Sequence, residues 1–488
     1  MKVLPNPLSD YLDVLQAAAK TNDGERCMIA PHPELRKQLK DQLTKLKRDL
    51  GSSVLSNLLT PLDNSRVGLN DGLLQPGSVF PLGTSAATTR AMSAAAAPLT
   101  GDLNVAVILV DFSDKPMKRS KKEFENLFFS EGIVATGSVK EYYREVTGGK
   151  VNITGKVIGP YRMPKKLSEY AHNASGMGSA LPNARTMAAD AAKASNPDIN
   201  FGTYDNNHDG YVDAFVVIHA GSGAEVTGKK TDIWSHKWVL PSTYDADGTH
   251  IYGYLTVPED CKLGVCAHEL GHLLFGFPDL YDTDYTSEGI GSWCLMAGGS
   301  WNNNGDTPAH PCAWCKVKQD WVTMVKQSTN KAGVVLDDVK NSKTVYRLWK
   351  DGGPGNEYFL LENRAKKNYD KHIPGEGLLI YHIDDAISDN SNELHYKVAL
   401  VQADGLKQLE SGANSGDDGD SWPGSKKKKT FSTSTTPSSK SYGGLDTSVA
   451  VKNISLAAGK ITADLFVKTG PATAAKKKTK KKKAKAKK

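Results

Sequence analysis

The 488-residue chain lacks any apolar run long enough to cross a membrane. Its longest apolar segments, such as residues 105–110 and 214–218, are only as long as a β-strand, whereas a spanning helix needs about 20 apolar residues. The N-terminus also lacks an ordinary secretory signal, because Pro5, Pro7 and Asp10 interrupt its apolar residues. We therefore expect no transmembrane segment.

Cysteine is scarce, and the six present are too few for a disulfide-stapled scaffold. Five of them lie between Cys261 and Cys315, whereas Cys27 stands apart. The even number permits disulfides without requiring them, so the redox compartment stays open.

An excess of charge of one sign is confined to the C-terminal tail. Residues 476–488 contain ten lysines, whereas the net charge of the whole chain is +7. The rest of the chain therefore carries a net charge of 7 − 10 = −3 and is mildly acidic. The tail has no aromatic or arginine side chain for stacking or base recognition, so we expect no specific nucleic-acid partner. Residues 470–488 are predicted to be disordered and to contact polyanions only non-specifically.

The rest of the chain divides into three regions. Residues 1–100 hold an amphipathic helix at 33–50 and a small, polar connector at 83–100, so they are predicted to be separable from the body. In residues 101–335, strand and helix patterns mix, which indicates an α+β domain. From 336 to 469, short strands between Gly, Pro, Asp and Asn turns predict an antiparallel β-sandwich.

Individual elements follow from the periodicity of the apolar residues. In the α+β region we expect strands at 104–111 and 211–219 and helices near 120–129, 138–146, 182–194, 263–275 and from about 309. In the sandwich region we expect strands at 357–362, 377–383, 397–402 and 461–467.

The most informative segment is CAHELGHLLFGFPDLYD, residues 266–282. His268 and His272 are four positions apart, so on a helix both imidazoles can reach one tetrahedral zinc ion. Glu269 lies beside them and can act as general base on a zinc-activated water and then pass the proton to the leaving amine. The pattern predicts peptide-bond hydrolysis, with a chance match on an ordinary helix as the alternative.

The residues after this helix extend the zinc signature. Gly276 can end the helix in a left-handed turn, and Asp279 then offers a carboxylate that can return to the metal. Asp282 and Glu288 are alternative third ligands. Met296 lies in a glycine-flanked turn and fits a hydrophobic floor beneath the metal, although it could equally be a plain core residue.

These motifs resemble those of the immune inhibitor A family of secreted zinc metallopeptidases. The likeness covers roughly residues 100–468 and rests on HELGH, PDLYD, SWCLMAGGSW and on the segments at 105–114, 138–157, 204–225, 233–238, 357–364 and 377–384. The resemblance implies a metzincin-like zinc endopeptidase that acts on proteins or peptides and is made as a zymogen, with residues 1–100 as prosegment. It assigns His268, His272 and Asp279 to zinc and Glu269 to the base.

One departure from the family pattern concerns the turn after the helix. The family places the glycine three residues after the second histidine and the acidic ligand six after it. Here Gly276 is four and Asp279 seven residues after His272, with Phe275 as the additional residue. One more helical residue rotates the exit by about 100° and lifts it by about 1.5 Å, so the turn must absorb that change.

Residues 205–213 predict a calcium loop that leads into a strand. Oxygen-bearing side chains recur at positions 1, 3, 5 and 9 with Gly210 at position 6, as in the first part of an EF-hand. Position 12 is Val216, so the segment is not an EF-hand, and a polar turn is the alternative. The predicted ligands are Asp205, Asn207, Asp209, Tyr211 and Asp213. Residues 416–420 are a weaker candidate.

The cysteines suggest two further sites. Cys27 could place a prosegment thiolate on the open position of zinc and keep the enzyme latent, with an incidental buried thiol as the alternative. Cys261-x4-Cys266 and Cys312-x2-Cys315 could form a four-thiolate zinc site or two local disulfides.

Two other functional classes stay open. One is a catalytically silent family member that binds through its β-sandwich, although the intact histidines and glutamate argue against it. The other is a nucleic-acid binder, which rests on the lysine tail alone. Tyr281, Tyr285 and His310 are the candidates for stabilising the transition state.

Overall fold

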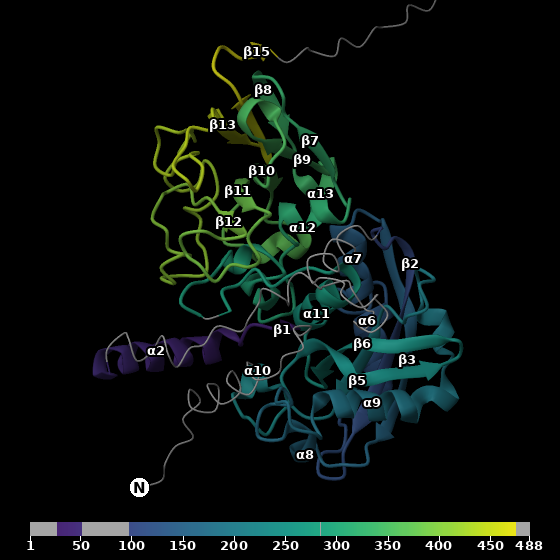
Figure 1. Ribbon diagram of the computed structural model, residues 1–488. Coiled ribbons are helices and arrows are strands. Elements are labelled where there is room, and N and C mark those ends of the chain that lie inside the picture. The colour runs from purple at the N-terminus through teal and green to yellow at the C-terminus, as the bar shows by residue number, and fades with distance from the viewer. Residues whose placement is uncertain (1–26, 51–96, 284, 475–488) are drawn as a thin grey trace, which may run out of the picture.

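The computed structural model describes residues 27–50, 97–283 and 285–474, and it contains two sheet-based bodies. The body formed by residues 97 to about 320 mixes helices with one sheet, and the C-terminal body consists mainly of strands (Figure 1). The α+β prediction is therefore confirmed. No helix in the described ranges is both long and apolar enough to cross a bilayer. Residues 83–96 of the connector and 475–488 of the tail lie outside the described residues. Residues 473–474, predicted to be part of the disordered tail, instead form a short strand that pairs with residues 331–332.

A six-stranded sheet forms the centre of the first body. Its strands are β1 (Cys27–Met28), β2 (Gly101–Asp111), β3 (Val151–Arg162), β4 (Phe215–His219), β5 (His236–Ala246) and β6 (Thr249–Pro258), in the order β1-β5-β6-β4-β2-β3. The four strands from β3 to β6 in this order are parallel, whereas β5 and β1 are antiparallel to their neighbours. All five residues of β4 are buried, as a central parallel strand requires.

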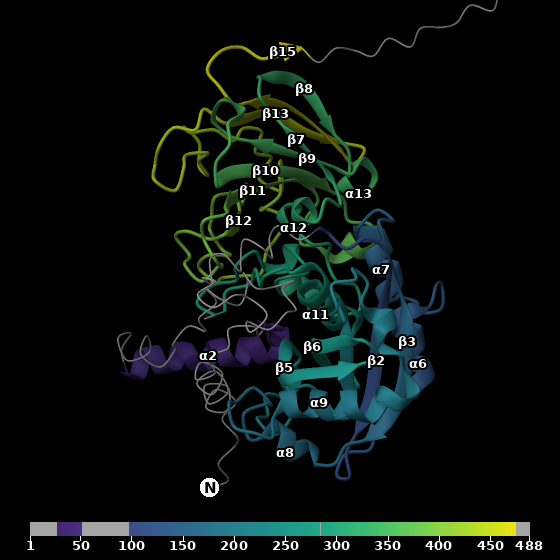
Figure 2. The same ribbon diagram turned by 45° about the vertical axis from the view of Figure 1, so that its right-hand side comes forward.

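Several helices cover this sheet. The helices α6 (Lys121–Phe129) and α7 (Val139–Val146) contact β3, and α7 also contacts α11 (Leu263–Phe275). The helix α9 (Ala184–Ser195) contacts β5 and the short α8 (Leu167–Ala171). The helices α6 and α7 are each capped by a serine and by the glutamate three residues after it. In both helices the two side chains bond each other's backbone N–H and so form a complete capping box. Figure 2 shows α7 and α11 above the sheet and α9 in front of it.

The C-terminal body contains two sheets that share one core. One has the order β12-β11-β10-β9-β7 and the other β13-β14-β8-β15. Their bounds are β7 (Thr323–Lys326), β8 (Lys331–Leu336), β9 (Thr344–Leu348), β10 (Glu357–Arg364), β11 (Gly377–Asp384), β12 (Val398–Leu400), β13 (Ala450–Ala457), β14 (Lys460–Phe466) and β15 (Thr473–Ala474). Phe359 and Ile380 of the first sheet join Ile461 and Leu465 of the second in that core. The arrangement agrees with the predicted sandwich.

Three features of this body differ from the sequence prediction. The strands β7 and β8 lie before residue 336, yet they pair with β9 and β14 and so belong to the sandwich sheets. Two pairings, β7 with β9 and β8 with β15, are parallel. The remaining short helices are α10 (Ala224–Thr227), α12 (Ala313–Lys318) and α13 (Val339–Ser342), and α12 begins four residues later than expected.

A buried ionic network joins the two bodies. Lys316 of α12 lies 2.8 Å from the Glu362 carboxylate of β10, and both side chains are almost fully buried. Arg364, also on β10, donates to the Trp293 carbonyl at 2.6 Å and pairs with Asp370. Within each buried pair the opposite charges compensate each other. Because Glu362 and Arg364 both belong to β10, these contacts tie α12 and the turn at Trp293 to the sandwich.

Gly155 lies on β3 at a position where the neighbouring strand β2 leaves no room for a side chain. Its φ is +149°, and a Cβ there would clash with the Val105 backbone carbonyl. We expect Gly155→Ala to lower the free energy of unfolding by about 3 kcal/mol or more, measured by urea denaturation. Gly149 has φ of +84° but open space around its Cβ position, so Gly149→Ala should cost only about 1 kcal/mol. Equal losses in the two variants would show that the clash is unimportant.

Candidate metal centre

The candidate centre is built on α11, all thirteen residues of which are buried. The Nε2 atoms of His268 and His272 lie 3.0 Å apart. The Nδ1 atom of His268 lies 3.0 Å from the Leu295 carbonyl, and that of His272 lies 2.5 Å from the Phe277 carbonyl. Because a carbonyl oxygen only accepts, each Nδ1 donates to it, which turns the two Nε2 atoms toward each other.

Asp279 completes this arrangement. Its Oδ1 atom lies 3.2 Å from each of the two Nε2 atoms, and its side chain is 7 % exposed. Three potential ligand atoms therefore meet in a buried space, an arrangement that could hold a shared cation. Zinc–nitrogen bonds of about 2.0–2.1 Å give a tetrahedron edge of about 3.3 Å, so the three atoms fit one zinc ion. Asp279, rather than Asp282 or Glu288, is the carboxylate that meets the histidines.

The turn after α11 accommodates the additional residue by widening. Gly276 takes the left-handed conformation at φ 60° and ψ 33°, and its N–H faces the carbonyls of both Gly271 and His272. The Phe277 N–H reaches back six residues to the Gly271 carbonyl at 3.2 Å. The added side chain, Phe275, packs edge-on against Trp321. The wide turn thus returns the chain so that Asp279 reaches the histidines and Phe277 supplies its carbonyl to His272.

Met296 packs against α11, the helix that carries the two histidines. The residue is fully buried, and its Sδ atom would lie 2.8 Å from a Cβ placed on Gly271. Gly271 therefore lets the methionine turn approach the helix closely. The preceding residue, Leu295, supplies the carbonyl that orients His268. The turn thus contacts α11 and positions the first histidine, and a floor beneath the metal stays a prediction.

Glu269 is buried next to the histidines. Neither of its carboxylate oxygens makes a hydrogen bond of normal geometry within the described part of the chain. Burial raises its pKa well above the usual range of a carboxyl group. A buried, unsatisfied carboxyl beside three metal-ligand atoms is typical of a catalytic group rather than a structural one.

The N-terminal segment covers this centre. Cys27, which is 1 % exposed, places its Sγ within 4.8 Å of ligand atoms of His272 and Asp279. Burial opposes the charged form of His272, but Cys27 and Asp279 together hold the pKa of this histidine well above its ordinary range. The prediction that Cys27 faces the metal position therefore agrees with the geometry.

Residues 27–40 are held in place along the rim of the centre. The strand β1 pairs antiparallel with β5. Three consecutive carbonyls, at residues 28, 29 and 30, each accept a hydrogen bond from the domain, at 2.6, 2.8 and 2.8 Å from Tyr281, Trp234 and Trp301 respectively. The first turns of the helix α2 (Pro33–Leu50) then place Arg36 3.0 Å from the buried Glu288 carboxylate, and Lys40 also contacts Glu288.

Comparison with known proteins agrees with this geometry. The model of the immune inhibitor A peptidase M6 catalytic domain matches residues 100–327. This part of the chain, 228 of its 488 residues, thus resembles the M6 catalytic domain. Immune inhibitor A of Bacillus thuringiensis subsp. alesti is 37 % identical over 230 residues, which cover 39 % of this chain and 33 % of that protein.

A second relative is the pre-pro-metalloprotease PrtV of Vibrio cholerae serotype O1 (strain M66-2). It is 30 % identical over 267 residues, or 43 % of this chain and 29 % of the relative. The matched part of the chain thus spans about a third of each relative. The M6 match includes α11, Asp279 and Met296 but not Cys27 or most of the sandwich.

The three candidates for transition-state stabilisation make different contacts. Tyr281 donates to the Met28 carbonyl of the N-terminal segment, and its ring stacks with that of Tyr285 at a centroid distance of 6.0 Å. His310 pairs with Glu145 at 3.0 Å. The sequence analysis missed Trp234 and Trp301, which hold the N-terminal segment, because nothing in their local sequence marks an indole as a donor to a distant backbone.

The predicted calcium loop of the M6 domain is closed by its own hydrogen bonds. The Asp209 N–H donates to Asp205 at 3.1 Å and to Asn207 at 3.0 Å, and the Gly210 N–H donates to Asp205 at 3.0 Å. Asp213 is buried and accepts the Asn206 N–H at 2.6 Å. These bonds are those of a polar turn, the alternative interpretation, and calcium binding stays a prediction.

The predicted four-thiolate site is not formed. The Sγ atoms of Cys261 and Cys266 lie 3.5 Å apart as a separate pair. Cys312 and Cys315 instead gather with Cys294, a residue that the spacing argument did not consider. None of the six cysteines forms a disulfide, so the two local disulfides are also absent.

The Asp213 carboxyl provides a test of the calcium loop. Burial raises its pKa to about 7, above about 3.9 for an unfolded Asp. Its neutral form therefore contributes stability that is present below about pH 4 and is lost as the pH rises through about 7. We expect Asp213→Asn to become progressively more stable than the wild type over this range in thermal unfolding.

Calcium should reverse the difference if the loop binds it. At pH 8, millimolar CaCl2 should raise the melting temperature of the wild type and of Asp245→Asn, a control at an exposed carboxylate outside the loop. It should leave Asp213→Asn unchanged. The same calcium effect in all three proteins would rule out a site at this loop.

Proposed function

We propose that the protein is a zinc-dependent endopeptidase, made as a secreted precursor whose N-terminal segment blocks the centre. The observation that carries the proposal is the convergence of three acceptor atoms from His268, His272 and Asp279 beside the unsatisfied carboxyl of Glu269. The M6 match and the metalloprotease relative support it.

His268, His272 and Asp279 would hold the zinc ion. Bound there, zinc would lower the pKa of a water molecule and polarise a peptide carbonyl. The chain's own contribution begins with orientation, because the Leu295 and Phe277 carbonyls hold both imidazoles with Nε2 toward the shared position. Neither ring can turn away without losing a buried hydrogen bond.

Glu269 would act as general base and then as general acid. It follows His268 on the same helix, so its carboxyl lies beside the metal ligands without belonging to the group that they form. In the covered state its pKa is raised by burial. Removal of the N-terminal segment would admit water and favour the ionised form, which can take a proton from the attacking water and pass it to the leaving amine.

Latency would follow from the position of residues 27–30. Cys27 lies where its thiolate can take the remaining position at the metal and exclude the catalytic water. The paired strand and the side-chain hydrogen bonds to three successive carbonyls hold it there. The Vibrio relative is named a pre-pro-protein, which is consistent with a precursor form.

A test of the enzyme uses activated protein and casein. We expect Glu269→Ala to lower the cleavage rate by about 10²–10⁴-fold, the usual contribution of a general base. Zinc content, measured by mass spectrometry, should stay near that of the wild type, because Glu269 is not a ligand. Full wild-type activity after complete zinc chelation would refute the mechanism. An inactive wild type that binds zinc would favour the alternative, a silent binding protein.

A second test addresses latency. We expect Cys27→Ser to undergo premature autoprocessing, followed by intact mass and N-terminal sequencing, because a hydroxyl binds zinc more weakly than a thiolate. Cys261→Ser, which alters another buried thiol, should remain a precursor. Adding Glu269→Ala to Cys27→Ser should restore the intact chain. An intact, inactive Cys27→Ser protein would contradict the proposed role of the thiol.

A further inference from the structure

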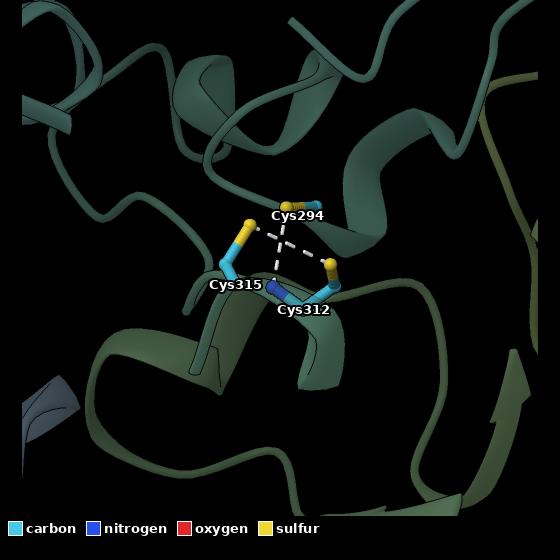
Figure 3. A group of neighbouring side chains, drawn as sticks. All are labelled: Cys294, Cys312 and Cys315. Carbon is cyan, nitrogen blue, oxygen red and sulfur yellow. Dashed lines mark hydrogen bonds between the residues drawn. The ribbon is translucent and has the colours of Figure 1, made fainter. Parts of the chain in front are cut away.

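A second group of potential metal ligands lies apart from the catalytic centre. Cys294, Cys312 and Cys315 are fully buried, and their sulfur atoms lie within 4.8 Å of one another. Cys294 comes from the turn before Met296, whereas the other two come from the start of α12. Figure 3 shows the three side chains turned toward one another from these two segments. None of them takes part in the proposed hydrolysis.

The spacing of the sulfur atoms suits a shared ion. Cys312 and Cys315 have their Sγ atoms 3.7 Å apart. Zinc–sulfur bonds of about 2.3 Å give a tetrahedron edge of about 3.8 Å, and a planar three-coordinate ion gives an edge of about 4 Å. A disulfide would join only two of the three sulfur atoms and would leave the third as an unbonded thiol, whereas one metal ion can bind all three.

Cys294 has the surroundings of a thiolate. Its sulfur accepts the backbone N–H of Met296 at 3.4 Å and that of Cys312 at 3.2 Å. Two backbone N–H groups aimed at one buried sulfur suit a thiolate ligand, whose charge a bound cation would balance.

The cationic side chains nearby are already committed. Lys316, the residue after Cys315, pairs with Glu362, and Arg364 pairs with Asp370. Within the described residues, both cations are thus paired with carboxylates. A metal ion would supply the missing positive charge and would be bound by all three sulfurs at once.

We propose that Cys294, Cys312 and Cys315 form a separate, structural site for a thiophilic d10 cation, either Zn²⁺ or Cu⁺. Thiolate ligands prefer such soft or borderline ions. The ion would tie α12 to the turn that contains Leu295 and Met296. Because Leu295 orients His268 and Met296 packs against Gly271, the site would also stabilise the floor of the catalytic centre.

The experiment measures metal content in the full chain with the catalytic ligands removed. In His268→Ala/His272→Ala protein, reconstituted anaerobically with Zn²⁺ or with Cu⁺ and then desalted, we expect about one tightly held ion per chain. Adding Cys294→Ser should reduce this to near zero. Adding Cys261→Ser, the matched control at the other buried cysteine pair, should leave it unchanged. The ion retained against a competing chelator identifies the metal.

Three results would overturn the proposal. The first is that the protein retains neither Zn²⁺ nor Cu⁺ although all its thiols react with a thiol reagent. The second is that Cys261→Ser loses as much metal as Cys294→Ser. The third is a Cys312–Cys315 disulfide in freshly isolated protein. If the double-histidine protein does not fold, the wild type should hold about two ions and Cys294→Ser about one. If the catalytic proposal is wrong, the wild type should lack the ion that depends on His268 and His272 but keep the ion that depends on Cys294. The failures of the two proposals therefore give different metal contents.

Discussion

The crowding of three lone-pair donors into one buried space is the constraint on which the rest of this protein depends. The two Nε2 atoms and the Asp279 Oδ1 lie 3.0–3.2 Å apart, and neither imidazole can rotate because a backbone carbonyl holds its other nitrogen. Such a group is unfavourable without a cation. The wide turn at Gly276, the methionine turn and the buried helix all serve to keep these atoms together.

The N-terminal segment uses ordinary secondary-structure chemistry to cover that space. It extends the sheet by one short strand, and indole and phenol groups of the domain bind its next carbonyls. The buried Arg36–Glu288 pair then anchors the start of α2. Glu288, one of the alternative ligands considered from the sequence, is thus occupied by a cation from the covering segment and not by the metal.

The cysteines show how far spacing arguments reach. Cys312-x2-Cys315 marked a local pair correctly, because residues three apart at the start of a helix share a face. Its third member, Cys294, comes from a turn eighteen residues earlier, and only the packing of that turn against α12 brings the sulfurs together. Cys261 and Cys266 form a separate pair. The suggested four-thiolate site was therefore wrong, because spacing along the chain does not show which cysteines from distant segments meet in space.

The sequence by itself determined the elements whose chemistry is local. The helix with its two histidines, the helices capped by Ser120 and Ser138, and the α+β character follow from short-range periodicity and capping. The strands β3, β5 and β6 were missed, and β7 and β8 were assigned to the wrong body, because strand pairing depends on distant partners. The resemblance had already assigned Asp279, which lies only seven residues after His272. The sequence raised the approach of Cys27 to His272 only as a hypothesis, and the tertiary structure decided it, because these residues lie 245 positions apart in the chain.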